Sequence, residues 1–212
     1  MRVPKFITFE GGEGAGKSTQ VDRLSNAFKK QKIPLITTRE PGGSHGAEAI
    51  RSLLVSGNPN RWQPKTELLL HYAARIEHIS NLLKPSLDQG KWVISDRFSD
   101  STFAYQGFGH GIDLRELTNI HAFAVENYKP DYSILLDLTV KQGLSRAKAR
   151  KINEDRYEQM SHDFHERVRR GFLEMSAKEP DRFIVIDGSQ PVDYVALKVI
   201  EAINKRFDLN LI

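Results

Sequence analysis

The stretch Phe6–Thr19, FITFEGGEGAGKST, decides the fold of this chain. It opens with Phe6–Phe9, an apolar run of the aromatic and β-branched kind that forms a buried strand. The pattern G-x-x-x-x-G-K-[ST] of a phosphate-binding loop is then completed by Gly11, Gly16, Lys17 and Ser18. Apolar residues at helical spacing continue as far as Lys30, so the loop lies between a strand and a helix, the context that this motif requires.

The chemistry of a polyphosphate explains the spacing in this loop. Glycines let successive backbone N–H groups turn toward the anion, and the N-terminus of the following helix adds partial positive charge. Lys17 can reach the β and γ phosphates, and the Ser18 hydroxyl suits Mg²⁺. A glycine-rich turn that contains Lys-Ser by chance would leave the flanking strand and helix unexplained. We therefore predict that a nucleoside triphosphate binds to Gly11, Gly12, Glu13, Gly14, Ala15, Gly16, Lys17, Ser18 and Thr19.

The composition bounds the class of protein. A length of 212 residues suits one domain with a proper core, and we predict a single domain over residues 1–212. The chain has no cysteine, which rules out disulfides and thiolate metal sites. We expect no signal peptide and no membrane span, because the apolar runs are short, and we therefore expect a cytoplasmic protein. The net charge of +4 suits either a nucleic-acid binder or a nucleotide enzyme.

Strand and helix patterns alternate along the rest of the chain. Further strands are expected at residues 34–38, 92–95, 132–138 and 183–186. Helices are expected at residues 19–30, 47–55, 66–87, 101–127, 140–149, 157–178 and 192–207, with a glycine-rich break at 107–111 and a kink or an early end at Pro85. This alternation predicts an α/β fold with a parallel, doubly wound sheet of about five strands covered by helices on both faces.

The class of phosphate-loop protein follows from what the chain lacks and from its size. A signalling GTPase would carry N-K-x-D and D-x-x-G, but neither is present, since residues 204–207 read N-K-R-F. Motor and transporter ATPases usually need a much longer chain. Small size and many arginines in loops favour a kinase whose small acceptor is itself phosphorylated.

The strand at 92–95 delivers Asp96 and Arg97 at its carboxyl end, where sites form in parallel sheets. A carboxylate suits Mg²⁺, so we predict that Asp96 helps Ser18 to hold the ion, through water; a strand-end cap or a salt bridge is the alternative. The planar guanidinium of Arg97 matches phosphate oxygens in two places, which makes it the leading candidate for the acceptor phosphate.

Four motifs resemble those of the thymidylate kinase family, most closely the bacterial enzymes, and their order and spacing extend the resemblance over essentially the whole chain. They are Glu10–Thr19, Thr38–Gly43 (TREPGG), Asp96–Phe98 and Ala104–Gly107 (AYQG). The resemblance implies a phosphate-loop kinase that transfers the γ-phosphoryl group of ATP to dTMP, giving dTDP and ADP, with Mg²⁺. It also implies a mobile LID, here about residues 149–157, and a homodimer packed through helices, with no nucleic acid or membrane as a partner.

The resemblance assigns roles around the transferred phosphate. Glu13 would accept a hydrogen bond from the 3′-hydroxyl of the acceptor. Some relatives have an arginine at the next position, where this chain has Gly14, so the cation must come from elsewhere. We predict that the LID supplies it through Arg150 and Arg156, ahead of Lys151; a solvated helix face is the alternative for this charged stretch.

The resemblance also assigns the nucleoside and the remaining cations. Arg75 would donate to the carbonyl of thymine, with Gln106, Ser101 and Thr102 adding bonds, and Tyr105 would crowd the 2′ position of the sugar unless it is a core tyrosine. The family's stacking phenylalanine is replaced by His71, so Tyr72 is a second candidate for the stacking partner. Arg39 and Arg51 would assist Arg97, although Arg51 suits a solvated helix face equally well. Arg146 would stack on adenine or lie on a helix surface.

Two other functions remain open at this point. One is a kinase for another pyrimidine nucleoside monophosphate, such as dUMP, UMP or CMP. The other is a non-catalytic ATP-binding module, which would have no use for Asp96, Arg97 and the acceptor-side residues.

Overall fold

A five-stranded parallel sheet organises the computed structural model, which describes residues 3–126, 128–149 and 155–212. The strands lie in the order β2-β3-β1-β4-β5, and every neighbouring pair is parallel. They are β1 (Phe6–Glu10), β2 (Leu35–Arg39), β3 (Trp92–Asp96), β4 (Tyr132–Asp137) and β5 (Phe183–Asp187). The predicted parallel sheet of about five strands is confirmed.

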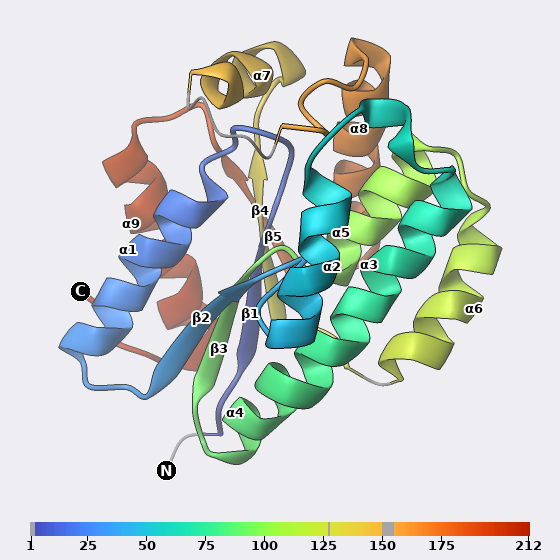
Figure 1. Cartoon of the computed structure of the whole chain (residues 1–212). Helices are drawn as coiled ribbons and strands as arrows, with labels where there is room; N and C mark the ends of the chain where they lie inside the picture. The colour runs from blue at the N-terminus through green and yellow to red at the C-terminus, as the bar shows by residue number, and fades with distance from the viewer. Residues whose placement is uncertain (1–2, 127, 150–154) are drawn as a thin grey trace.

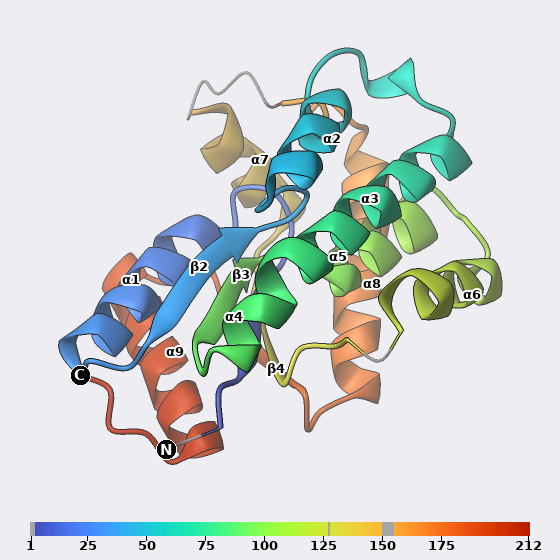
Figure 2. The same ribbon diagram turned by 60° about the horizontal axis from the view of Figure 1, so that its bottom comes forward.

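Helices cover both faces of this sheet. The α-helices are α1 (Lys17–Lys30), α2 (His45–Val55), α3 (Pro64–His78), α4 (Lys84–Asp88), α5 (Ser99–Thr102), α6 (Leu114–Val125), α7 (Val140–Lys148), α8 (His162–Lys178) and α9 (Val192–Phe207). Shorter elements are the 3₁₀ turn η1 (Pro59–Arg61) and the π-helical segments η2 (Ile79–Leu83) and η3 (Phe103–Gly109). Helices α1 and α9 lie on one side of the sheet, and α3, α6 and α8 lie on the other (Figures 1 and 2). Among the described residues no helix has the length and apolarity to cross a membrane.

Three helix predictions differ from the structure. The glycine-rich break predicted at 107–111 begins later, because the π-helical segment η3 continues as far as Gly109. The stretch predicted as one helix over 66–87 contains the π-helical segment η2 just before Pro85, which has no N–H for the regular ladder, and α4 then continues with this proline in its first turn. The helix predicted from Tyr157 begins at His162, because the Ser161 hydroxyl caps it by accepting a hydrogen bond from the backbone N–H of Phe164.

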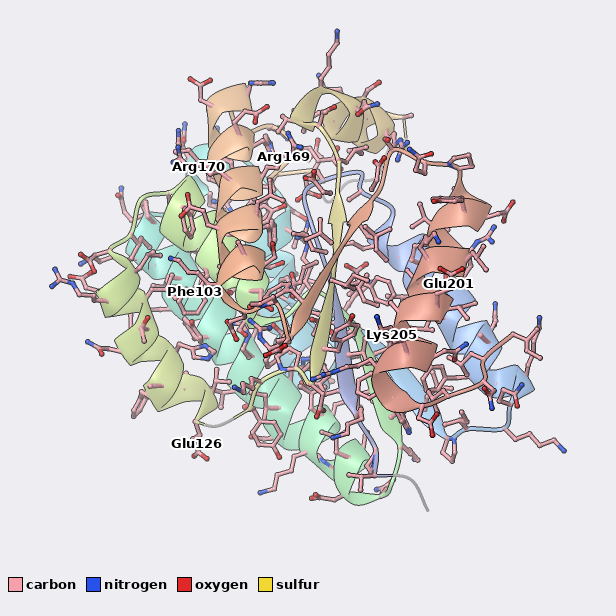
Figure 3. All side chains as sticks on the ribbon, turned by 180° about the vertical axis from the view of Figure 1, so that it is seen from behind. Phe103, Glu126, Arg169, Arg170, Glu201 and Lys205 are labelled. Carbon is pink, nitrogen blue, oxygen red and sulfur yellow. The ribbon has the colours of Figure 1, made fainter. Side chains whose placement is uncertain are left out.

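The core lies on both faces of the central strands. All five residues of β1 are buried, as is expected for a strand that has helices above and below it. On one face Phe28 of α1 and Val199 of α9 pack against Ile7 and the neighbouring strands. On the other face Leu68 of α3 belongs to a second cluster with Phe6. Figure 3 shows the sheet from behind, with β5 running between α8 and α9.

The carboxyl ends of the strands form one charged edge. The last residues of the five strands are Glu10, Arg39, Asp96, Asp137 and Asp187. The register pairs Asp96 with Phe9 on one side and with Arg39 on the other, so these ends are adjacent. The phosphate-binding loop, between β1 and α1, leaves the sheet at this edge, which is where a ligand site is expected in a parallel sheet.

Candidate active site

The loop between β1 and α1 requires glycine at two of its positions. Gly11 and Gly14 have φ angles of 136° and 67°, in the region that side chains disfavour. A Cβ would lie 2.5 Å from the carbonyl oxygen of Leu136 at Gly11, and 2.0 Å from that of Gly143 at Gly14. The loop therefore keeps its backbone N–H groups clear of side chains, as the phosphate-binding pattern predicts.

Lys17 folds back into this loop. Its Nζ donates to the backbone oxygens of Gly11 at 3.2 Å and Gly12 at 2.8 Å. Burial and the positive charge of Arg97 lower the pKa of the Lys17 amine to about 8. The amine therefore lies at the mouth of the loop, where an arriving phosphate would replace the two carbonyls as its partner.

Ser18 and Asp96 meet at the end of β3. The Ser18 hydroxyl donates to the Asp96 carboxylate at 2.6 Å, and both residues line a cleft with the loop and with Arg39 and Arg97. A hydroxyl and a carboxylate oxygen are the hard ligands that Mg²⁺ takes, and Mg²⁺ usually fills the remaining positions with water and substrate phosphates. The absence of a cluster of three or more acidic or histidine ligands among the described residues is therefore compatible with a magnesium site.

Arg97 joins the loop to the next helical segment. Its backbone has a φ of 71°, which is uncommon for a residue with a side chain and typical of functional sites. Its Nη1 donates to the Gly11 oxygen at 2.8 Å and to the Ser101 hydroxyl at 3.1 Å. Its Nη2 donates to Glu13 and to the Tyr105 hydroxyl, both at 3.0 Å.

Glu13 is an ionised carboxylate inside the phosphate-binding loop. Burial alone would raise its pKa, but the charges of Arg97 and Lys17 and a hydrogen bond from Tyr105 at 2.8 Å hold it at about 2. The Glu13 carboxylate thus pairs with Arg97 and Tyr105 in this structure.

A second cavity adjoins this cleft, and Glu13, Arg51 and Arg97 line both of them. The residues predicted for the acceptor gather here: Arg51, His71, Arg75, Arg97, Ser101, Thr102, Tyr105 and Gln106 all line the cavity. They come from α2, α3, β3 with its following loop, α5 and η3, which are far apart in the sequence. The structure therefore brings together the phosphate loop and the predicted acceptor residues.

Arg75 is a buried cation, and one of its guanidinium nitrogens has no hydrogen-bond partner among the described residues. Its Nε donates to Glu40 at 2.8 Å, and its Nη2 donates to Thr102 at 2.8 Å and to the backbone oxygen of Phe98 at 3.3 Å. Its Nη1 is buried and has no hydrogen-bond partner within the described part of the chain. Glu40 also bonds the Nδ1 of His78 at 2.9 Å, and this support fixes the orientation of Arg75. A buried donor without a partner in a cavity wall points to a ligand.

His71 lines the cavity as a neutral ring. Burial lowers the pKa of its imidazole to about 4, so its charge does not vary near neutral pH. Its Nε2 lies 2.8 Å from the hydroxyl of Tyr157. Tyr72 lies in the core against Arg75 and His121 and does not line the cavity, which leaves His71 as the candidate for stacking.

Arg39, Arg51 and Arg146 occupy three different settings. Arg39 is exposed, lines the phosphate-loop cleft and pairs with Glu48 at 3.1 Å. Arg51 donates to the backbone oxygen of Pro41 at 2.6 Å. Arg146 donates to the Gly188 oxygen at 2.8 Å and lines a surface cleft next to Gly14, Gly16 and Thr19 of the loop. Its predicted contact with adenine stays a prediction, with which this position beside the loop is compatible.

Arg156, predicted as a LID cation, lies away from the phosphate loop. It is fully buried, and its Nη2 donates to Glu67 at 2.5 Å and to the oxygen of Pro59 at 2.9 Å. The structure does not bring it into either cleft. The predicted LID at about 149–157 is only partly covered, since Arg150 and Lys151 lie outside the described residues.

Some polar residues of the site were missed at the sequence level. Glu10 accepts hydrogen bonds from the backbone N–H of Phe98 at 2.8 Å and from Ser101 at 2.6 Å, and burial together with the negative charge of Asp100 raises its pKa to about 8. The position of Glu10 at the carboxyl end of β1 indicates that it lies near the site. Arg169 of α8 holds Asp137, the last residue of β4, through two bonds of 2.7 and 2.8 Å, and Figure 3 labels it at this end of the sheet. Nothing in the sequence indicated that pair.

Comparison with known proteins gives one consistent result. Residues 9–199 match the family described as Thymidylate kinase. Thymidylate kinases from Caulobacter vibrioides and Magnetococcus marinus are 46% and 45% identical to this chain; the alignments cover 96% of the chain in both cases and 98% and 97% of the relatives. A crystal structure of thymidylate kinase from Ehrlichia chaffeensis is similar in fold, with a TM-score of 0.76, 34% identity and coverage of 95% of this chain and 98% of that one.

Proposed function

The chain belongs to the thymidylate kinase family, and from this premise we propose how its two adjoining clefts share the reaction. The enzyme transfers the γ-phosphoryl group of ATP to dTMP, giving dTDP and ADP. The cleft at the phosphate-binding loop holds the triphosphate of ATP, and the cavity beyond Arg97 holds dTMP. Neither the other pyrimidine monophosphates nor a non-catalytic role is favoured by the relatives.

The position of Arg97 is the observation that supports assigning ATP to one cleft and dTMP to the other. It lines both clefts and contacts the loop carbonyl of Gly11 as well as Glu13 and Ser101 on the acceptor side. A guanidinium in this position binds the phosphate of dTMP within reach of the γ-phosphate above Lys17. Transfer between two anions depends on positioning and charge neutralisation, and both cations serve that purpose without a covalent intermediate.

The far end of the cavity suits the base of dTMP. The Nη1 of Arg75, which has no partner among the described residues, supplies a donor for the O4 carbonyl of thymine, and Gln106 lies in the same wall. Tyr105, held by Glu13 and Arg97, stands against the sugar and excludes a 2′-hydroxyl. His71 stacks on the base as a neutral ring.

Ser18 and Asp96 are the residues that would hold Mg²⁺, Ser18 directly and Asp96 through water. Their oxygens already lie 2.6 Å apart at the mouth of the loop, and the set of donors suits a hard cation. When bound, the ion supplies neutralisation of charge on the phosphate oxygens. Some relatives have an arginine where this chain has Gly14, and the LID supplies the cation in its place. Arg150 is the first candidate, because Arg156 is paired with Glu67 inside the protein.

Two broader properties complete the proposal. We propose a homodimer that packs through α3 and α6, because these adjacent helices expose Leu69, Ile76, Leu114 and Phe123, the last with 86% of its surface accessible. We also propose a cytoplasmic location, where ATP and nucleotide precursors are available.

ADP release coupled to oxidation of NADH tests the function. With ATP and Mg²⁺, we expect kcat/KM to be highest for dTMP, lower for dUMP and at least ~100-fold lower for UMP and CMP, because unpaired polar groups in a built pocket are costly. Reactions without Mg²⁺ or without acceptor give the background. A higher kcat/KM with UMP or CMP than with dTMP would contradict the assignment.

Replacement of His71 by Phe tests the stacking partner. We expect the Kd of dTMP to fall about three- to tenfold, because a phenyl ring offers more apolar area than imidazole. Calorimetric titration with dTMP measures it. Tyr157→Phe is the matched control, since it removes the same hydrogen bond without changing the ring at position 71. An unchanged Kd in His71→Phe would show that another side chain stacks on thymine.

A further inference from the structure

Glu67, in the first turn of α3, is a fully buried carboxylate whose neighbours come from distant segments. It accepts a hydrogen bond from Nε2 of Gln106 at 2.7 Å and from Nη2 of Arg156 at 2.5 Å. The Nε2 of His110 lies 3.2 Å from the same oxygen that Gln106 contacts. None of the motifs quoted from the sequence includes this residue.

The charge of Glu67 restricts its partners. Burial alone would raise its pKa, but the imidazole of His110 and the positive charges around it, Arg156 among them, hold the pKa at about 2. An ionised carboxylate accepts hydrogen bonds and donates none. Gln106 must therefore present its NH₂ group to Glu67, because the flipped amide would place two oxygens against each other at 2.7 Å.

This constraint leaves the carbonyl oxygen of Gln106 for another partner. That oxygen, Oε1, is buried and has no hydrogen-bond partner in the described part of the chain. Gln106 lines the dTMP cavity together with Arg75, whose Nη1 is in the same condition. The wall of the cavity thus holds one acceptor and one donor, both fixed from behind by carboxylates, Glu67 and Glu40.

The Gln106 oxygen and the Arg75 Nη1 complement the hydrogen-bonding edge of thymine but not that of cytosine. Thymine offers the O4 acceptor and the N3–H donor, while cytosine offers an amino donor at C4 and an unprotonated N3. We infer that Glu67 is a positioning residue that holds the Gln106 carbonyl toward N3–H and so sets the preference for thymine over cytosine. The inference rests on the proposed binding of dTMP in this cavity.

Glu67→Gln tests it, because a neutral amide can donate as well as accept and no longer fixes the Gln106 amide. We expect the ratio of kcat/KM for dTMP to kcat/KM for dCMP to fall about tenfold or more. Both substrates are assayed on one preparation, so the fraction of folded enzyme cancels from the ratio. Glu174→Gln, on the solvent-facing part of α8, is the matched control with an unchanged ratio.

A double variant separates Glu67's action on Gln106 from its bond to Arg156. In a Gln106→Met background, Glu67→Gln should leave the ratio unchanged, since the amide through which it acts is gone. A fall of the same size in that background, or an unchanged ratio in the single variant, would overturn the inference. Absence of activity toward dTMP in the wild-type enzyme would instead overturn the proposed function.

A measurement on the wild-type enzyme does not depend on the variants folding. In an NMR experiment on the dTMP complex, we expect scalar coupling across the hydrogen bond from the Gln106 side-chain nitrogen to the carboxyl carbon of Glu67. Coupling from that nitrogen to C4 of thymine, with none to Glu67, would show that the amide donates to the O4 carbonyl of the base in the opposite orientation, and would refute the inference.

Discussion

Lys17→Ala is expected to lower kcat by about 10³-fold or more and to leave the fold intact, because it removes the ammonium group that we propose binds the transferred phosphate. Among the described residues its side chain bonds only the backbone oxygens of Gly11 and Gly12, and it belongs to none of the hydrophobic core clusters, so its loss should leave the core intact. Steady-state ADP release measures kcat, and far-UV circular dichroism with thermal unfolding measures the fold.

The control for this variant is Lys30→Ala, at the other end of the same helix, where the side chain is exposed. We expect its kcat to equal that of the wild type. If Lys17→Ala turns over dTMP within a few-fold of the wild-type rate, Lys17 has no part in the transfer.

Arg97→Ala has the second largest expected effect, a loss of about 10³-fold in kcat/KM for dTMP. The variant loses the proposed contact with the acceptor phosphate and also leaves the partly buried carboxylate of Glu13 without its ion-pair partner. Arg97→Lys restores the charge but not the fork that contacts Gly11, Ser101 and Glu13 together, so we expect it to recover about tenfold at most. Initial rates at varied dTMP separate kcat from KM.

Arg170→Ala is the comparison for Arg97. This arginine projects from the outer side of α8, with 65% of its side chain exposed, and is labelled in Figure 3. We expect no change in kcat/KM. Wild-type kcat/KM in Arg97→Ala would remove Arg97 from the binding of the phosphate.

The fold and the donor cleft are the parts that sequence reasoning describes best. The phosphate-binding loop is a local signal, since strand, glycines, lysine and helix follow one another within Phe6–Lys30. Alternation of strands and helices then predicts a parallel sheet, and a parallel sheet aligns its carboxyl ends, which places Asp96 beside the loop. The acceptor residues required the resemblance as well, because they come from separate helices.

The remaining errors concern long-range pairing, which a charge pattern does not show. Arg156 reads as part of a charged loop, yet its partner Glu67 lies 89 residues away and draws it into the interior. Glu67 itself precedes three leucines and reads as an ordinary helix-surface acid. The low pKa of the His71 imidazole is likewise a consequence of burial by the tertiary structure, which the sequence alone does not show. Sequence reasoning recognises such residues by type but not by environment.

The ion pair between Arg97 and Glu13 bears on how the enzyme lets go of its nucleotide. In the free protein the carboxylate pairs with the guanidinium at 3.0 Å, so a monophosphate that binds Arg97 as proposed would have to displace a carboxylate of the protein itself. If Arg97 binds the acceptor phosphate as proposed, this exchange weakens capture of dTMP and equally weakens retention of dTDP, because Glu13 pairs with Arg97 again as the diphosphate leaves. A carboxylate that competes for Arg97 in this way would shorten the residence time of the product and keep the site available for the next turnover.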